Sequence, residues 1–167
     1  LWFGWYQPVN SIGKVQQWHG NAGAVVRSWA FYRRFGKELR TMSQHAVLNA
    51  NYLRHAIFRE AKKAGVDDMF CDGAPTTVAK HEFTLSLQPA KEKYGISAMD
   101  VAKGLLDKGY MAPTVYFPLV VPECMMIEPT ETESKEVLDE FAKNFVEVLQ
   151  IDAETLHAAP TTTPVRR

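Results

Sequence analysis

The sequence predicts an α/β chain of the α+β type, in which helices cover one face of a small, mostly antiparallel sheet. Three observations lead to this prediction. Apolar residues recur at three- and four-residue steps across residues 37–63, which indicates a long helix with one buried face. Residues 77–88 alternate apolar and polar side chains, as a half-buried strand does. Shorter helix and strand patterns then alternate as far as residue 150.

The first 36 residues are expected to hold an irregular segment followed by one helix. Breaking residues interrupt residues 1–20, so no regular element is predicted there. Asn21 is a typical N-cap for a helix that continues to Phe35, and Gly36 then breaks the helix. The breaking residues are Pro8, Gly13 and Gly20.

A long helix is expected next, from Lys37 to Lys63, and it leads into the sheet. Its apolar residues share one face, which should be buried. Ala64-Gly65 ends the helix, since glycine accepts the left-handed conformation that closes many helices. The residues of the apolar face are Leu39, Met42, Ala46, Leu53 and Ile57.

Four strands are predicted. The clearest covers residues 77–88, and its polar side chains give it one wet or functional face. The others are short apolar stretches at residues 69–71, 115–117 and 125–127. The alternating residues of the clearest strand are Phe83, Leu85 and Leu87 against Glu82, Thr84 and Ser86.

Two further helices carry capping signals. Ser97 with Asp100 is similar to a capping box, and it should open a helix that ends near Lys108 and Gly109. Thr130 with Glu133 should open the last helix, from Glu131 to Gln150. Its inner face would carry Leu138, Phe141, Phe145 and Val148. Beyond Ile151 the chain turns polar and rich in Thr and Pro, which predicts a loose tail.

Composition excludes several classes of protein. Hydrophobic residues make up 46% and charged residues 23%, which is ordinary for a soluble globular chain. Nineteen basic residues balance nineteen acidic ones, so net charge gives no reason to expect a nucleic-acid or membrane partner. No apolar run approaches the roughly 20 residues of a membrane helix, and no signal peptide is evident. The start at Leu, followed by several aromatic residues, suggests a piece of a longer chain.

The charges are unevenly distributed along the chain. Residues 27–63 contain nine basic residues against Glu38 and Glu60, whereas residues 123–154 contain ten acidic residues against Lys135 and Lys143. Two interpretations stay open. The segments are either oppositely charged solvated helix faces, or the basic half is a docking surface for an acidic partner.

Cysteine and histidine show no metal pattern. Cys71 and Cys124 form neither a disulfide framework nor a zinc spacing, and a reducing compartment is the simpler interpretation. His45 and His55 lie ten residues apart, so one helix face cannot present both to a metal. No metal site is predicted.

Two residues are candidates for the substrate side of a site. Arg27 could clamp a carboxylate through two parallel hydrogen bonds, although a solvated or ion-paired arginine is the common alternative. His81 opens the clearest strand and could exchange protons with a substrate, or could be structural. Free amides around residues 11–21, before a helix start, could hold an anion. Asn49 lies near the apolar seam of the long helix and should be hydrogen-bonded to fix local packing.

Four strings, in order, resemble a known family. They are Ser-Ile-Gly with Gly-Asn in residues 11–21, Asn-Ala-Asn-Tyr-Leu in 49–53, His-Glu-Phe in 81–83, and the block from Pro113 through Glu-Pro-Thr-Glu-Thr-Glu in 128–133. Together they make the chain, from about Pro8 to Leu149, similar to the C-terminal region of the pyridoxal-phosphate-dependent glycine decarboxylases. These are the P-proteins of the glycine cleavage system, or their second subunit where the enzyme is split.

The resemblance implies a fold and an activity. The fold is the small C-terminal domain of an aminotransferase-like, fold type I enzyme. Residues 1–36 would be a linker and helix that follow the cofactor domain, residues 37–150 the C-terminal domain, and residues 151–167 a flexible tail. Pyridoxal 5′-phosphate is the electron sink for loss of carbon dioxide from glycine, and the aminomethyl group passes to the lipoyl arm of the H-protein.

The family also implies where the chemistry lies. Its Schiff-base lysine is in the preceding domain, so no lysine here is assigned as catalytic, no residue is assigned to the cofactor, and this chain alone should be inactive. The implied partners are the remainder of the P-protein or its partner subunit and the lipoylated H-protein, in a dimer or heterotetramer, with no nucleic acid and no membrane. The implied compartment is the bacterial cytoplasm or the mitochondrial matrix. A non-catalytic module that keeps the fold, or another fold type I enzyme, stays an alternative.

Overall fold

The structure is a computed structural model that describes residues 9–12, 20–73 and 78–163. Its chain divides into two units, residues 1–39 and residues 40–167. The aromatic start of the chain and most of the expected anion-binding segment, residues 13–19, lie outside the described residues.

The first unit contains helix α1 (Ala22–Phe35). Asn21 caps it as predicted, because its side chain accepts a hydrogen bond from the amide of Ala24 at 3.1 Å. The helix ends at Gly36, whose φ of +48° favours glycine, and a short 3₁₀ helix, η1 (Gly36–Glu38), follows. No residue of α1 is buried, and Trp29 is 64% exposed, although Phe35 at the end of the helix is partly buried.

Helix α2 (Leu39–Ala64) is the predicted long helix, and it begins two residues later than expected because η1 precedes it. The buried residues of α2 begin at Ala50. Met42 and Ala46, which belong to the predicted buried face, are only partly buried. Gly65 ends the helix with a φ of +72°. The buried residues are Ala50, Leu53, Arg54, Ala56, Ile57 and Ala61.

Four short strands form one sheet in the order β1-β2-β4-β3, and all neighbours are antiparallel. The strands are β1 (Cys71–Asp72), β2 (Phe83–Ser86), β3 (Thr114–Val115) and β4 (Cys124–Ile127). The antiparallel sheet is as predicted. Strand β2 is shorter than the predicted 77–88, and β3 lies at 114–115 rather than 115–117.

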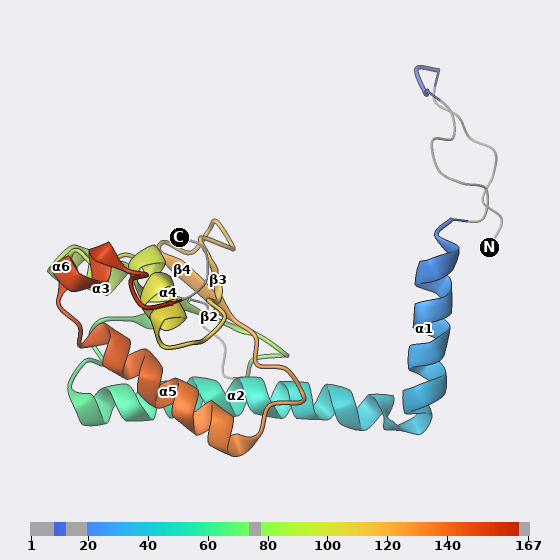
Figure 1. Ribbon diagram of the computed structural model, residues 1–167, viewed down its shortest axis with the longest axis horizontal. Helices are drawn as coiled ribbons and strands as arrows, with labels where there is room; N and C mark the ends of the chain where they lie inside the picture. The colour runs from blue at the N-terminus through green and yellow to red at the C-terminus, as the bar shows by residue number, and fades with distance from the viewer. Residues whose placement is uncertain (1–8, 13–19, 74–77, 164–167) are drawn as a thin grey trace. The chain divides into compact units, whose positions relative to one another are not determined.

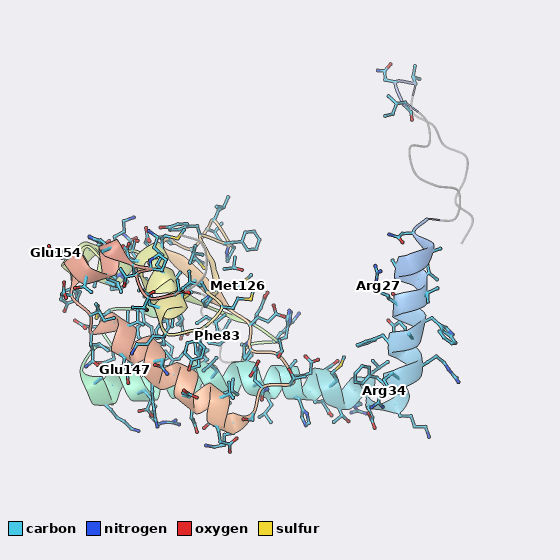
Figure 2. All side chains as sticks on the ribbon, viewed as in Figure 1. Arg27, Arg34, Phe83, Met126, Glu147 and Glu154 are labelled. Carbon is cyan, nitrogen blue, oxygen red and sulfur yellow. The ribbon has the colours of Figure 1, made fainter. Side chains whose placement is uncertain are left out.

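The sheet has an inner and an outer face. Phe83 and Leu85 of β2 lie opposite Ile127 and Met125 of β4, and all four belong to the hydrophobic core. The outer face was expected to be wet, but Ser86 is 6% exposed and its hydroxyl donates to a loop carbonyl, that of residue 122, at 2.6 Å. Figure 2 labels Phe83 and Met126, which come from β2 and β4.

Helix α4 (Ala98–Asp107) begins with the predicted capping box. Ser97 accepts from the amide of Asp100, and the carboxylate of Asp100 accepts from the amide of Ser97. Helix α5 (Lys135–Leu149) is the predicted last long helix, but its N-cap is Ser134 rather than Thr130. Residues 128–133 therefore form a loop before α5 instead of its first turn.

Two helices were not predicted. Helix α3 (Gln88–Tyr94) follows directly from the end of β2, with Leu87 as its N-cap. Helix α6 (Ala153–Ala158) lies where the polar composition predicted a loose tail, and its Leu156 is 1% exposed. The two lie side by side (Figure 1), and His157 of α6 contacts the carbonyl oxygen of Gly95 at 3.2 Å.

One hydrophobic core joins the helices to the inner face of the sheet. It combines β2 and β4 with residues of α2, α4 and α5, and Figure 1 shows α5 crossing α2. Helices therefore cover one face of a small antiparallel sheet, which confirms the predicted fold class. Core residues of the three helices include Leu53, Ile57, Val101, Leu105, Phe145 and Val148.

Candidate functional site

His81 lies at the rim of a hollow of about 430 Å³ between α2 and the loop that follows β4. Lys80 precedes it, and Glu128 and Glu131 come from the loop on the other side. The floor is apolar or small, since α2 contributes Met42, Ser43, Ala46 and Val47. The hollow thus combines a histidine, a lysine and two carboxylates around an apolar base, which is the composition of a polar binding site.

Strand pairing explains why His81 meets Glu128. Phe83 pairs with Ile127, so one position further along the ladder Glu82 and Glu128 face each other, with His81 beside them. The Nε2 atom of His81 lies 3.9 Å from Glu82 Oε2 and 3.9 Å from Glu128 Oε1. The imidazole is 54% exposed, so a substrate can reach it. Histidine between carboxylates is an arrangement that can accept and pass on a proton.

Arg27, the other expected substrate-side residue, lies on the exposed surface of α1 (Figure 2). It belongs to the unit of residues 1–39, whereas His81 belongs to the unit of residues 40–167. The proposed carboxylate clamp of Arg27 stays a prediction.

A second hollow, of about 380 Å³, lies on the other side of the same loop. Most of its wall is apolar, with Leu53 of α2 and Phe141 of α5 among the lining residues. Glu128, Pro129 and Thr130 line both hollows, so the loop of residues 128–133, the partition loop, separates them. A movement of the loop would change the shape of both sites together.

The start of α5, just after the partition loop, is fixed to α2. Tyr52 donates to Asp139 Oδ1 at 2.6 Å, and Lys135 donates to Asp139 Oδ2 at 2.5 Å. The bonds from Lys135 and then from Tyr52 hold the pKa of Asp139 below its usual value. The ammonium of Lys135 also lies 5.4 Å from the centre of the Tyr52 ring. The loop between β4 and α5 is therefore held firmly at its far end.

Asn49, which was expected to be hydrogen-bonded, lies among the described residues. Asn49 is hydrogen-bonded, and it fixes local packing by donating to the backbone of residues 130 and 133. Among the described residues, no group of histidine, cysteine and carboxylate side chains could hold a metal ion. In the same part of the chain, no helix has the length and apolar character needed to cross a membrane.

Glu128 was not among the site residues predicted from the sequence. Its position 47 residues after His81 gives no local signal, but the antiparallel pairing of the two strands brings them together. Recognition of β2 and β4 as neighbours would have placed residues 81, 82 and 128 at one edge of the sheet.

Comparison with known proteins gives a consistent answer. The family model for "Glycine dehydrogenase, C-terminal domain" matches residues 42–163. The probable glycine dehydrogenase (decarboxylating) subunit 2 of Nitrosospira multiformis is 47% identical over 161 residues, which are 94% of this chain and 31% of the relative. The protein of that name from Methylococcus capsulatus is 46% identical over the same shares. That from Desulforamulus reducens is 44% identical over 97% of this chain and 32% of the relative. The chain thus spans about a third of the length of these relatives.

Proposed function

Because this chain belongs to the glycine dehydrogenase C-terminal domain family, we propose that it forms the C-terminal part of a glycine-decarboxylating enzyme. The observation that carries the proposal is 47% identity to a glycine dehydrogenase subunit 2 over 94% of the chain. The longer protein that would contain it is called the parent protein below. The proposed reaction is decarboxylation of glycine with transfer of the aminomethyl group to the lipoyl arm of the H-protein.

The hollow beside His81 does not by itself fit pyridoxal phosphate. Two carboxylates and one lysine line it, and the carboxylates would repel the phosphate group, which needs cations or clustered amides. This hollow is therefore not proposed as the cofactor site. Its anchoring lysine and phosphate site are proposed to lie in the part of the parent protein outside these residues.

We assign this chain a role on the substrate side. His81 is exposed, and at 3.9 Å from two carboxylates it can donate a hydrogen bond to a bound group or take up a proton. The apolar hollow on the other side of the partition loop can accept a hydrocarbon chain, and the lipoyl arm has one. Arg27 is proposed to clamp a carboxylate. The partner subunit of a split P-protein and the H-protein are the proposed macromolecular partners.

The test uses the native parent protein with glycine labelled at its carboxyl carbon. We expect labelled carbon dioxide to be released when pyridoxal phosphate and the lipoylated carrier are both present. Carrier without the lipoyl group serves as the first control, and labelled alanine as the second.

The outcomes separate the alternatives. Borohydride reduction that fixes the cofactor to a lysine, without release from glycine, would indicate a different pyridoxal-phosphate enzyme. If the cofactor is not attached and no carbon dioxide is released from glycine, the protein is a non-catalytic module. Either of these two results would overturn the proposal.

A further inference from the structure

The partition loop and the segment before His81 are both attached to α2 by asparagine side chains two residues apart. Asn49 Nδ2 donates to the carbonyl oxygens of Thr130 at 2.9 Å and Glu133 at 3.1 Å. Thr130 lies two residues after Glu128 in the chain. One side chain of α2 therefore fixes the loop that presents Glu128 to the hollow.

Asn51 holds the other side of the same hollow. Its Nδ2 donates to the carbonyl oxygen of Ala79 at 2.8 Å, and its Oδ1 accepts from the amide of Ala79 at 2.9 Å. It also donates to the carbonyl oxygen of Val47 at 2.7 Å. Ala79 lies two residues before His81 and is 5% exposed. Asn51 thus pairs with Ala79 as a neighbouring strand would.

The spacing on the helix allows the two attachments. Residues two apart on an α-helix project about 200° apart, so one can reach the partition loop while the other reaches Ala79. Ala50, between them, is 0% exposed and anchors this part of α2 in the core. Both walls of the hollow are therefore hydrogen-bonded to the same helix, α2, and α2 sets the separation of His81 and Glu128.

Only an amide side chain can make the contacts of Asn51. It offers donors and an acceptor at one end without charge, whereas aspartate offers acceptors alone and leucine offers neither. Bonding to both the carbonyl and the amide of Ala79 also fixes which way the amide points. Loss of the side chain would leave a nearly buried backbone amide and carbonyl unpaired.

We propose that Asn49 and Asn51 are positioning residues, which hold His81 and Glu128 in the relative placement that the reaction requires. The inference rests on the proposed function. Neither asparagine lines either hollow. They act through the residues that do, since small displacements of a reacting group can lower a rate about 100-fold.

A double-mutant cycle in the parent enzyme tests this. We expect Asn51→Ala to lower kcat for glycine decarboxylation by at least about tenfold in a folded protein. Added to His81→Gln, the same change should lower kcat further by less than about twofold, because its effect passes through His81. Asn144→Ala is the matched control, since Asn144 on α5 also donates two hydrogen bonds but lines neither hollow. It should leave kcat unchanged.

Additive losses in the double mutant, or a normal kcat in Asn51→Ala, would overturn the proposal. If Asn51→Ala does not fold, Asn51→Asp takes its place. It keeps an acceptor for the Ala79 amide but loses the donors, and it should show the same non-additivity with a smaller loss.

A spectroscopic readout separates failure of this inference from failure of the proposed function. In the 167-residue chain, the ring resonances of His81 should shift in Asn51→Ala and stay in place in Asn144→Ala. A parent protein that releases no carbon dioxide from glycine would refute the function, and the resonances alone would then decide whether Asn51 positions His81. Unshifted His81 resonances would overturn it.

Discussion

Phe141 and Phe145 lie one turn apart on α5, but they differ in how completely they are enclosed. Phe145 is 0% exposed, and its ring meets that of Phe70 edge to face at a centroid distance of 5.7 Å. Phe141 is partly buried, meets Tyr110 at 5.1 Å, and forms part of the wall of the apolar hollow. The same substitution should therefore have unequal effects at the two positions.

The expected magnitudes follow from this difference. Truncation of an enclosed phenylalanine to alanine removes buried apolar surface and leaves a closed cavity, which together cost about 3–5 kcal/mol. We expect about 4 kcal/mol for Phe145→Ala, a large share of a typical domain's stability of about 5–15 kcal/mol. Phe141→Ala enlarges a hollow that already exists, so it loses mainly transfer free energy, about 2 kcal/mol.

Urea unfolding of the 167-residue chain, followed by far-ultraviolet circular dichroism, measures both values. Phe117→Ala is the control, since Phe117 is 56% exposed and should change the free energy of unfolding by less than about 0.5 kcal/mol. A loss for Phe141→Ala equal to or larger than that for Phe145→Ala would refute the assigned inner face of α5.

Three further predictions concern ionised groups. Burial raises the pKa of Asp107, but hydrogen bonds from the amides of residues 161–163 outweigh it and lower the pKa to about 2. The ionised carboxylate should contribute about 1 kcal/mol to the free energy of unfolding after allowance for screening. This contribution should be complete above about pH 4 and disappear as the pH falls through about 2. Urea melts of Asp107→Asn should lack it at every pH. Arg54→Met should lower the free energy of unfolding by about 2 kcal/mol, because Arg54 is 8% exposed and bonds Asp72 through two nitrogens at 2.8 and 2.6 Å. Lys93→Ala, which breaks a half-exposed pair, should change it by less than about 0.5 kcal/mol. In the parent enzyme, reversal of three exposed basic charges should raise the KM for an acidic lipoyl carrier but not the KM for glycine. Added salt should reduce the difference in carrier KM between this variant and the unmodified enzyme. These charges are Arg33, Arg34 and Lys37.

Local signals in the sequence predicted the elements that local interactions define. Asn21 and the Ser97–Asp100 capping box open helices where expected, because each cap bonds an amide three residues away. The long α2 was predictable from its spacing of apolar residues. The alternation of β2 correctly identified Phe83 and Leu85 as core residues.

Elements that depend on distant contacts were not predicted. Thr130 carries a capping-box pattern, yet its carbonyl accepts from Asn49, 81 residues away, and Ser134 caps α5 instead. Helix α3 has no side-chain cap, and Leu87 continues the alternation of β2, so the strand was extended through it. Helix α6 has one buried residue, Leu156, too few for an amphipathic pattern.

The candidate site shows the same division. His81 is a candidate because of its position at the start of a predicted strand, whereas Glu128 and the two asparagine attachments depend on strand register and loop packing. Asn51 in particular was part of a recognised string, and nothing in the string reveals that its partner is Ala79. Contacts across tens of residues are properties of the fold, and they became visible only in three dimensions.

The most direct test of the account compares two exposed histidines in the parent enzyme. His81→Gln removes the imidazole from the hollow, whereas His55→Gln changes an exposed histidine of α2 that lines neither hollow. With folding verified for both, we predict that His81→Gln lowers kcat for carbon dioxide release from glycine by about 10²-fold or more, as expected for loss of a proton-transferring group. His55→Gln should leave it unchanged. Equal rates for the two variants and the unmodified enzyme would contradict the assignment of the site.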